Sequence, residues 1–210
     1  GMCIAHDETA AEPTERAPST DDDDVMKLKH LRDWVGWSRP LRRTILGQVV
    51  KRVTPEDVVG ESWRLLANER NVRFNEMEYH LPPEQALDVL REVIAVIERE
   101  RPDAFFPIEV RRTAGDDAWL SPFNAGGRIS IAVHTHAPDD HQWFFTHVEP
   151  IFRRAGGRPH WGKLHSLGAA QLAELYPDFD RFLALRRELD PTNKLINAHT
   201  ARLFGEPDHD

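Results

Sequence analysis

The sequence predicts an α+β domain, with an antiparallel sheet that carries helices on one of its faces. An alternating strand pattern at residues 72–81 is followed by a helix with apolar residues spaced 3, 4 and 3 apart. Two further strand patterns and a second helix come after them. The order strand, helix, strand, strand, helix is most of a ferredoxin-like split unit. No internal repeat is visible, so residues 25–210 are predicted to form one domain.

Residues that start or stop regular structure bound the first three elements. Thr54 and Pro55 predict a helix start that leads to about Ala67. VRFNEMEYHL alternates like a strand, and the two prolines that follow it open the next helix, which ends near Pro102. The predicted buried stripe of this helix is Leu87, Leu90, Ile94 and Ile97.

The remaining elements follow from the same signals. Strands are predicted at about 105–112 and 128–136, joined by a loop that contains two adjacent glycines. Asp139 or Asp140 caps the next helix, which Pro150 is expected to kink and Gly156 and Gly157 to end. Short helices are expected at 168–175 and 178–188, before Asp190 and Pro191 break the pattern.

Composition excludes several classes of protein. No apolar run approaches the ~20 residues that a membrane span requires. The only cysteine, Cys3, allows neither an intrachain disulfide nor a thiolate metal cage. The first 20 residues lack the basic start and apolar block of a secretory signal, so a cytoplasmic location is predicted.

The net charge of −8 is divided unevenly along the chain. Residues 1–24 hold eight acidic side chains and one arginine, and they are predicted to be a disordered acidic tail. Residues 25–53 hold eight lysines or arginines with a single acid, and include Trp34 and Trp37. This basic segment fits either a nucleic-acid patch or a face that docks a partner. Docking is favoured, because the rest of the domain is acidic and would repel a phosphate backbone.

Two polar clusters are candidates for a site. RPHWGKLH at 158–165 places a lysine, two histidines and a tryptophan in eight positions. Glu109 and Arg111 are two apart in a strand pattern and should share a face, with Arg112 on the other. From spacing alone, Glu109 and Arg111 could be a surface ion pair, and Lys163 could be a lysine in an exposed turn.

Two histidines raise the question of a metal. His134 and His136 share one strand face, and His160 or His165 could be the third ligand of a zinc ion. Neither an HExxH pattern nor a carboxylate pair at ligand spacing accompanies them. No metal site is therefore predicted.

Three separated motifs occur in a family-like order: Glu-x-Arg at 109–111, a strand histidine at His134, and His-Trp-x-Lys at 160–163. Together they resemble the C-terminal half of the aldonolactone and alditol oxidases, FAD-linked enzymes of the vanillyl-alcohol oxidase type that include D-arabinono-1,4-lactone and L-gulono-1,4-lactone oxidases. FNEMEYHLP at 74–82 and LDPTNKLIN at 189–197 are similar as well, so the likeness covers roughly residues 40–205. The resemblance implies a ferredoxin-like cap, or substrate, domain that lies over the flavin.

The resemblance also implies roles for residues. His134 and Lys163 would be catalytic, with the Lys163 ammonium stabilising negative charge on the flavin ring as hydride arrives. Glu109, Arg111 and His136 would bind the sugar lactone or polyol, and the planar guanidinium fork suits hydroxyl groups. His136 stands where polyol oxidases tend to have a smaller hydroxyl residue, which implies an altered pocket. The flavin would be contacted by His160, Trp161 and Lys163.

The flavin-binding half of the family is not matched in this sequence. Neither glycine pair, at 126–127 or 156–157, follows a strand and opens a helix, so no phosphate cradle is assigned. We therefore expect the cap portion of an oxidoreductase that needs a separate FAD-binding polypeptide and does not hold FAD alone. The alternative is a non-catalytic domain that binds a sugar-like ligand or a protein. An open site face with an apolar rim that includes Trp161, and self-association through that face, are also expected.

Overall fold

The computed structural model describes residues 7–14, 21–51, 57–66 and 72–207. By contact, the chain divides into two compact units: Gly1–Arg73 with Arg101–Phe106, and Phe74–Glu100 with Pro107–Asp210. Among the described residues, no helix combines the length and the apolar character needed to cross a bilayer.

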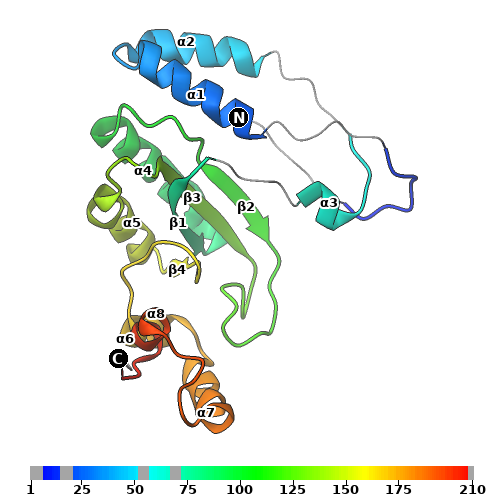
Figure 1. Cartoon of the computed structure of the whole chain (residues 1–210), viewed down its shortest axis with the longest axis vertical. Helices are drawn as coiled ribbons and strands as arrows, with labels where there is room; N and C mark the ends of the chain where they lie inside the picture. The colour runs from blue at the N-terminus through cyan, green and yellow to red at the C-terminus, as the bar shows by residue number, and fades with distance from the viewer. Residues whose placement is uncertain (1–6, 15–20, 52–56, 67–71, 208–210) are drawn as a thin grey trace. The chain divides into compact units, whose positions relative to one another are not determined.

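The second unit has the predicted α+β architecture. Its elements run β1 (Phe74–Leu81), α4 (Pro83–Glu100), β2 (Glu109–Thr113), β3 (Arg128–His136), the π-helix η1 (Phe144–Val148), α5 (Glu149–Arg154) and β4 (Arg158–Pro159). The sheet is antiparallel with strand order β2-β3-β1-β4 (Figure 1). This is the order of a ferredoxin-like fold, and the two-residue β4 is the final strand that the sequence pattern lacked.

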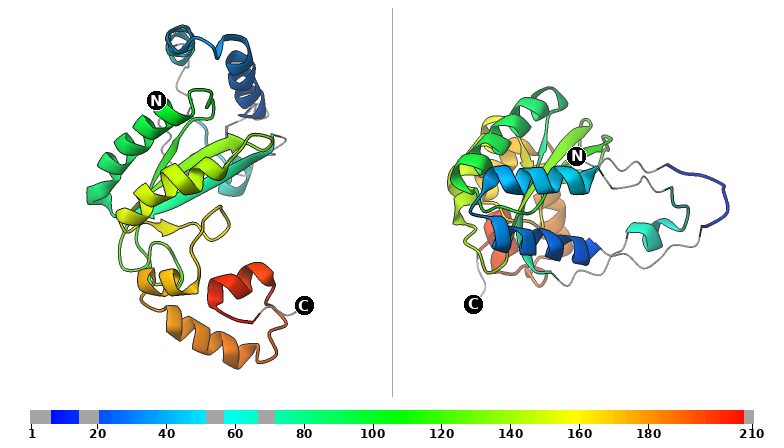
Figure 2. Two further views of the ribbon diagram at one scale, coloured as in Figure 1. Left: turned by 90° about the vertical axis from the view of Figure 1, so that its left-hand side faces the viewer. Right: turned by 90° about the horizontal axis from the view of Figure 1, so that it is seen from above.

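Helices α4 and α5 cover one face of this sheet (Figures 1 and 2). The core beneath them contains Met77 and Tyr79 of β1 and Ile131 of β3, all fully buried. The ring of Phe152 on α5 stacks on Tyr79 with centroids 5.1 Å apart. Alternation along β1 sends Glu76, Glu78 and His80 to the opposite face.

The predicted buried stripe of α4 was wrong by one position. Leu87 is 57% exposed and Ile94 is also exposed, while Leu90 and Ile97 are only partly buried against the core. The buried stripe is Ala86, Val89, Val93 and Val96. Both sets have 3-4-3 spacing, so the period could not choose between them, and the smaller set lets the helix approach the sheet closely.

The helix after β3 is distorted where the sequence placed a kink. Five residues of π-helix precede Pro150, and α5 begins at Glu149. Proline cannot donate a backbone hydrogen bond, which favours such a local rearrangement. The Asp140 carboxylate accepts from the Gln142 amide at 2.8 Å, and Gly156 follows α5 with φ of 65°.

Three short helices complete the second unit: α6 (Ala169–Leu175), α7 (Phe179–Leu189) and α8 (Ala198–Phe204). The first two match the predicted helices within one residue. The third was not predicted, although Asn197 caps it by accepting from the Thr200 amide at 2.9 Å.

The first unit contains α1 (Asp21–Val35), α2 (Arg39–Val50) and α3 (Ser62–Leu66). The helix predicted from Thr54 was wrong over residues 57–61; α3 starts at Ser62, and Thr54 itself lies outside the described residues. The backbone groups of Val59 are used outside a helix: its amide donates to the Thr14 hydroxyl, and its carbonyl accepts from the Thr14 amide.

The acidic segment differs in part from the predicted tail. Its last four residues, 21–24, belong to α1, which starts at Asp21. Residues 1–6 and 15–20 lie outside the described part of the chain, so disorder there stays a prediction. The single domain predicted for residues 25–210 also stays a prediction.

Candidate functional site

The sheet face opposite α4 and α5 carries the candidate site, and we call it the polar face. Register fixes its members, because residues directly paired on neighbouring antiparallel strands point to the same side. Glu109 pairs with Ala132, Arg111 with Ser130, and Glu76 with His134. The polar face therefore comprises Glu76, Glu78 and His80 of β1, Glu109 and Arg111 of β2, and Ser130, His134 and His136 of β3.

Glu76 is the centre of the first group on this face. Its buried carboxylate forms an ion pair with the Lys163 ammonium through Oε2, and its Oε1 lies 3.4 Å from His134 Nε2. Burial alone would raise the pKa of Glu76, but the hydrogen bonds from His134 and Lys163 outweigh it and lower the pKa to about 2. One ionised carboxylate thus holds both predicted catalytic side chains.

Glu78 organises a second group beside the first. Arg111 Nη2 donates to Glu78 Oε1 at 2.7 Å, and Arg111 Nη1 lies 3.4 Å from Glu109 Oε1. Glu78 is buried, whereas Glu109 and Arg111 are about half exposed. The guanidinium therefore bridges a buried carboxylate and one open to solvent.

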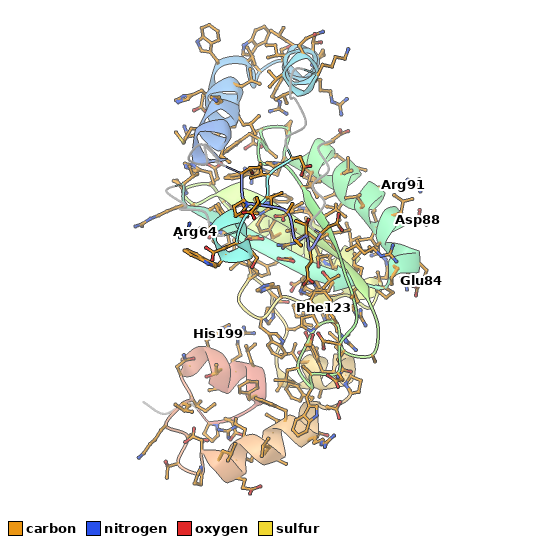
Figure 3. The ribbon with its side chains drawn as sticks, turned by 90° about the vertical axis from the view of Figure 1, so that its right-hand side faces the viewer. Arg64, Glu84, Asp88, Arg91, Phe123 and His199 are labelled. Carbon is orange, nitrogen blue, oxygen red and sulfur yellow. The ribbon has the colours of Figure 1, made fainter. Side chains whose placement is uncertain are left out.

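His80 is a buried member of the polar face. Its Nδ1 lies 2.7 Å from Ser130 Oγ, and its ring meets His160 and Phe123 with centroids 5.8 and 4.8 Å away (Phe123 is labelled in Figure 3). Burial and the neighbouring cationic groups lower the pKa of His80 to about 3, so the ring is neutral at pH 7. Its 3.9 Å approach to Glu78 is then not an ion pair.

Two buried atoms here have no hydrogen-bond partner within the described part of the chain: Glu78 Oε2 and His80 Nε2. Orphaned buried polar atoms are rare because each costs roughly 1–3 kcal/mol. A carboxylate oxygen can accept a hydrogen bond from a ligand hydroxyl, and a protonated ring nitrogen can donate one to it.

The loop that carries Lys163 is attached to the edge of β1. The His160 amide donates to the Glu78 carbonyl at 3.0 Å, and the Leu164 amide to the Glu76 carbonyl at 2.9 Å. Backbone bonds thus continue the β4 pairing beyond Pro159 and bring Lys163 over the polar face. Trp161 Nε1 donates to the Leu120 carbonyl at 2.7 Å, which ties this loop to the connection between β2 and β3.

The structure brings Glu109, Arg111, His134 and Lys163 to one face, as the motifs predicted. The His160 ring lies next to the His80 ring of the same face, with centroids 5.8 Å apart. His136 shares the face and pairs with Phe74 at its end. Trp161 is not part of an exposed apolar rim: it is half-buried against Tyr176, with ring centroids 5.0 Å apart. The functional roles of these residues stay predictions.

Histidines do not assemble into a metal centre in the described ranges, where no group of three or more potential His, Cys, Asp or Glu ligands gathers. His165 is instead buried, and burial together with the Arg202 charge lowers its pKa to about 4. It cannot serve as a third ligand beside His134 in this arrangement.

Sequence reasoning missed Glu76, Glu78, His80 and Ser130. A signal for three of them was present, because the FNEMEYHL strand places polar residues at every second position. Their parity alone assigns them to the face opposite Met77 and Tyr79, as the structure has it.

The second unit is thus an α+β domain with a ferredoxin-like sheet. Helices pack on one face of the sheet, and the other face gathers paired carboxylates, an arginine, histidines and a lysine. The chain belongs to the D-arabinono-1,4-lactone oxidase family, whose model matches residues 4–203.

Individual relatives agree with this family. The chain is 42% identical over 148 residues to an L-gulono-1,4-lactone dehydrogenase of Mycobacterium tuberculosis, which covers 70% of this chain and 35% of the relative. An L-gulonolactone oxidase of Bos taurus is 30% identical, covering 68% and 34%. An alditol oxidase of a Streptomyces species is 38% identical over 127 residues, covering 57% and 29%. The chain thus spans about a third of the length of these relatives.

We expect Glu76→Gln to lower the free energy of unfolding by about 2 kcal/mol, because it leaves Lys163 and His134 without their buried anion. Urea unfolding at pH 7 measures this effect. Glu92→Gln is the matched control, since Glu92 pairs with Arg154 at 2.7 Å on the surface and such pairs contribute at most ~1 kcal/mol. Equal losses in the two variants would contradict the role given to Glu76.

Proposed function

We propose that this chain is the substrate-binding cap portion of an FAD-linked oxidoreductase, which oxidises the CH–OH group of an aldonolactone or polyol together with a separate FAD-binding polypeptide. The observation that carries the proposal is the convergence of Glu109, Arg111, His134 and Lys163 on the polar face. Membership of the lactone oxidase family supports the reaction class.

The polar face offers complementary groups for a hydroxylated substrate. Arg111 and Glu109 are half exposed and can bind hydroxyl groups by donating and accepting. The orphaned Glu78 Oε2 and His80 Nε2 give a further donor and acceptor position beneath them. Together they favour a ligand with several adjacent hydroxyls over an apolar alcohol.

Oxidation of the alcohol removes a hydride from carbon and a proton from oxygen. A flavin, when bound, supplies the acceptor for the hydride. In the proposed reaction His134 receives the hydroxyl proton at Nδ1, while Glu76, 3.4 Å from Nε2, orients the ring. The Lys163 ammonium supplies positive charge where negative charge develops during the transfer.

The described residues suit one end of FAD and not the other. Lys163 offers a cation to the flavin ring, whereas the nucleotide phosphates need a glycine-rich turn that opens a helix. Gly126 lies in the β2–β3 loop and Gly156 ends α5, so neither begins a helix. This supports a nucleotide site that lies outside the described residues.

A non-catalytic sugar-binding or protein-binding domain is the second candidate. It is favoured by the pairing of charges on the polar face, because Lys163 and Arg111 both already have carboxylate partners. A closed network of this kind can stabilise a fold without performing chemistry.

The test mixes the chain with FAD-loaded protein comprising the part of the mycobacterial relative that this chain does not match, and then adds L-gulono-1,4-lactone without oxygen. We expect the flavin absorbance to bleach, and Lys163→Ala to slow bleaching about a hundredfold. Arg112→Ala is the control, because Arg112 pairs with Ile129 on the other side of the sheet.

Calorimetry on the chain alone separates the two candidates. Lactone binding that Arg111→Ala abolishes, without bleaching in the mixture, would favour the non-catalytic domain. If the chain does not bind the lactone and the mixture does not bleach, both candidates are refuted.

A further inference from the structure

The basic segment has no role in the proposed function, and the structure shows what it builds. Helices α1 and α2 form a hairpin in which Trp34 lies in the last turn of α1 and Trp37 in the connecting turn. These side chains are 84% and 83% exposed, and Pro40 and Leu41 beside them are exposed as well. We call residues 34–41 the hairpin tip. Tryptophans this exposed are unusual in a folded unit, because each leaves a large apolar ring in water.

The turn itself is well defined. The Gly36 amide donates to the Arg32 carbonyl at 2.7 Å, and the Ser38 amide to the Val35 carbonyl at 3.0 Å. A Cβ on Gly36 would lie 2.3 Å from the Arg32 oxygen, so only glycine fits there. Val35, next to Trp34 in the sequence, is buried, whereas both tryptophans are exposed.

The hairpin is anchored to the rest of the first unit by residues that flank its tip. The Arg32 guanidinium lies 4.7 Å from the Phe105 ring centroid, and Arg42 donates to the Pro102 carbonyl. The segment 101–106 thus contacts both helices, and these contacts do not involve Trp34 or Trp37.

Charge around the tip is positive. Residues 25–51 contain seven lysines or arginines and one acid, Asp33, which pairs with Lys29 at 2.7 Å. By sequence, residues 25–51 therefore carry a net positive charge.

We propose that the α1–α2 hairpin binds the surface of an anionic lipid bilayer, with the tip inserted at the level of the headgroups and the surrounding basic side chains on the lipid phosphates. Tryptophan favours the membrane interface because its ring is apolar and its N–H polar. Basic residues add attraction to anionic lipids. Pro40 and Leu41 favour lipid over nucleic acid, because aliphatic groups gain from insertion and cannot stack on bases as aromatic rings do.

Sedimentation of the purified chain with phosphatidylcholine vesicles, with and without phosphatidylglycerol, tests the proposal. We expect binding only to the anionic vesicles, weakening as salt is raised, with a blue shift of tryptophan fluorescence. Trp34→Ala and Trp37→Ala should each weaken binding roughly tenfold, as expected for losing about 60 Å² of inserted apolar surface. Arg43→Gln should weaken it about fivefold.

Trp63→Ala is the matched control. Trp63 is 63% exposed in the same unit, but the Arg64 guanidinium lies over its ring at 4.9 Å (Arg64 is labelled in Figure 3). Its loss should leave vesicle binding unchanged. Failure to bind anionic vesicles, or binding retained by the Trp34→Ala/Trp37→Ala double variant with a native circular dichroism spectrum, would overturn the proposal. So would a tip-dependent dimer that does not bind lipid. None of these results bears on the lactone oxidase function.

Discussion

The free energy of unfolding falls steeply as the pH drops below about 6.5, because two buried histidines are held neutral. The pKa of His80 is lowered to about 3 and that of His165 to about 4, in both cases chiefly by burial. The unfolded chain binds a proton at each histidine near its ordinary pKa of ~6.5, whereas the folded chain does not until the pH is much lower. Stability is therefore fully present above pH ~6.5 and is lost on acidification.

The expected slope is about 1.4 kcal/mol per pH unit for each histidine between pH ~6.5 and ~4, so the two together remove on the order of several kcal/mol. Glu76 adds to the loss below pH ~4.5, since its folded pKa of about 2 lies under its unfolded value. Urea unfolding across this range measures the slope. The His165→Gln variant should reduce this slope by the contribution of one proton. His147→Gln is the control, because His147 is exposed. An unchanged slope in His165→Gln would contradict the role given to His165.

Arg158→Ala should lower the free energy of unfolding by about 3–5 kcal/mol. Arg158 is 5% exposed and donates to the carbonyls of Leu175, Pro122 and Asn124 at 2.9, 3.1 and 2.8 Å. Its guanidinium also lies 5.1 Å from the Tyr176 ring centroid. Removing it leaves three carbonyls, which are buried or part-buried, without their donor, and it leaves a cavity where the side chain packed.

Arg158→Lys should recover little of this loss, because a single ammonium cannot reproduce the planar fork that reaches three acceptors. Arg154→Ala is the control, since Arg154 is exposed and pairs only at the surface with Glu92. Thermal or urea unfolding distinguishes these variants. An Arg158→Lys variant as stable as the parent would show that charge alone suffices at this position.

The sheet and its helices could be predicted because local signals agreed with the tertiary arrangement. β1, α4 and β3 have strong periodicity and flanking prolines or glycines, and the structure has them within two residues of the predictions. Helices α1 and α2 could not be found in this way, since their apolar residues follow no clear stripe and two tryptophans point to solvent. In α4, two apolar sets shared one period, and only packing against the sheet selected the smaller one.

The site could be predicted only in its motif residues. Spacing put Glu109 with Arg111, and family likeness added His134 and Lys163. The carboxylates that join them, Glu76 and Glu78, come from a strand about 30 residues before Glu109 and about 85 before Lys163, as the contacts show. Pairings over such separations depend on register, which single-chain patterns do not fix.

One edge of the sheet adds a constraint on any redesign of the pocket. β2 is the outermost strand, five residues long, and charged side chains occupy both of its faces. Charge on a short open edge hinders pairing with the edge of another molecule. Glu109 and Arg111 therefore protect solubility as well as lining the polar face. Replacing both with valine to admit a more apolar substrate would create the run Ile-Val-Val-Val on that edge, and such a variant should aggregate before its specificity could be measured.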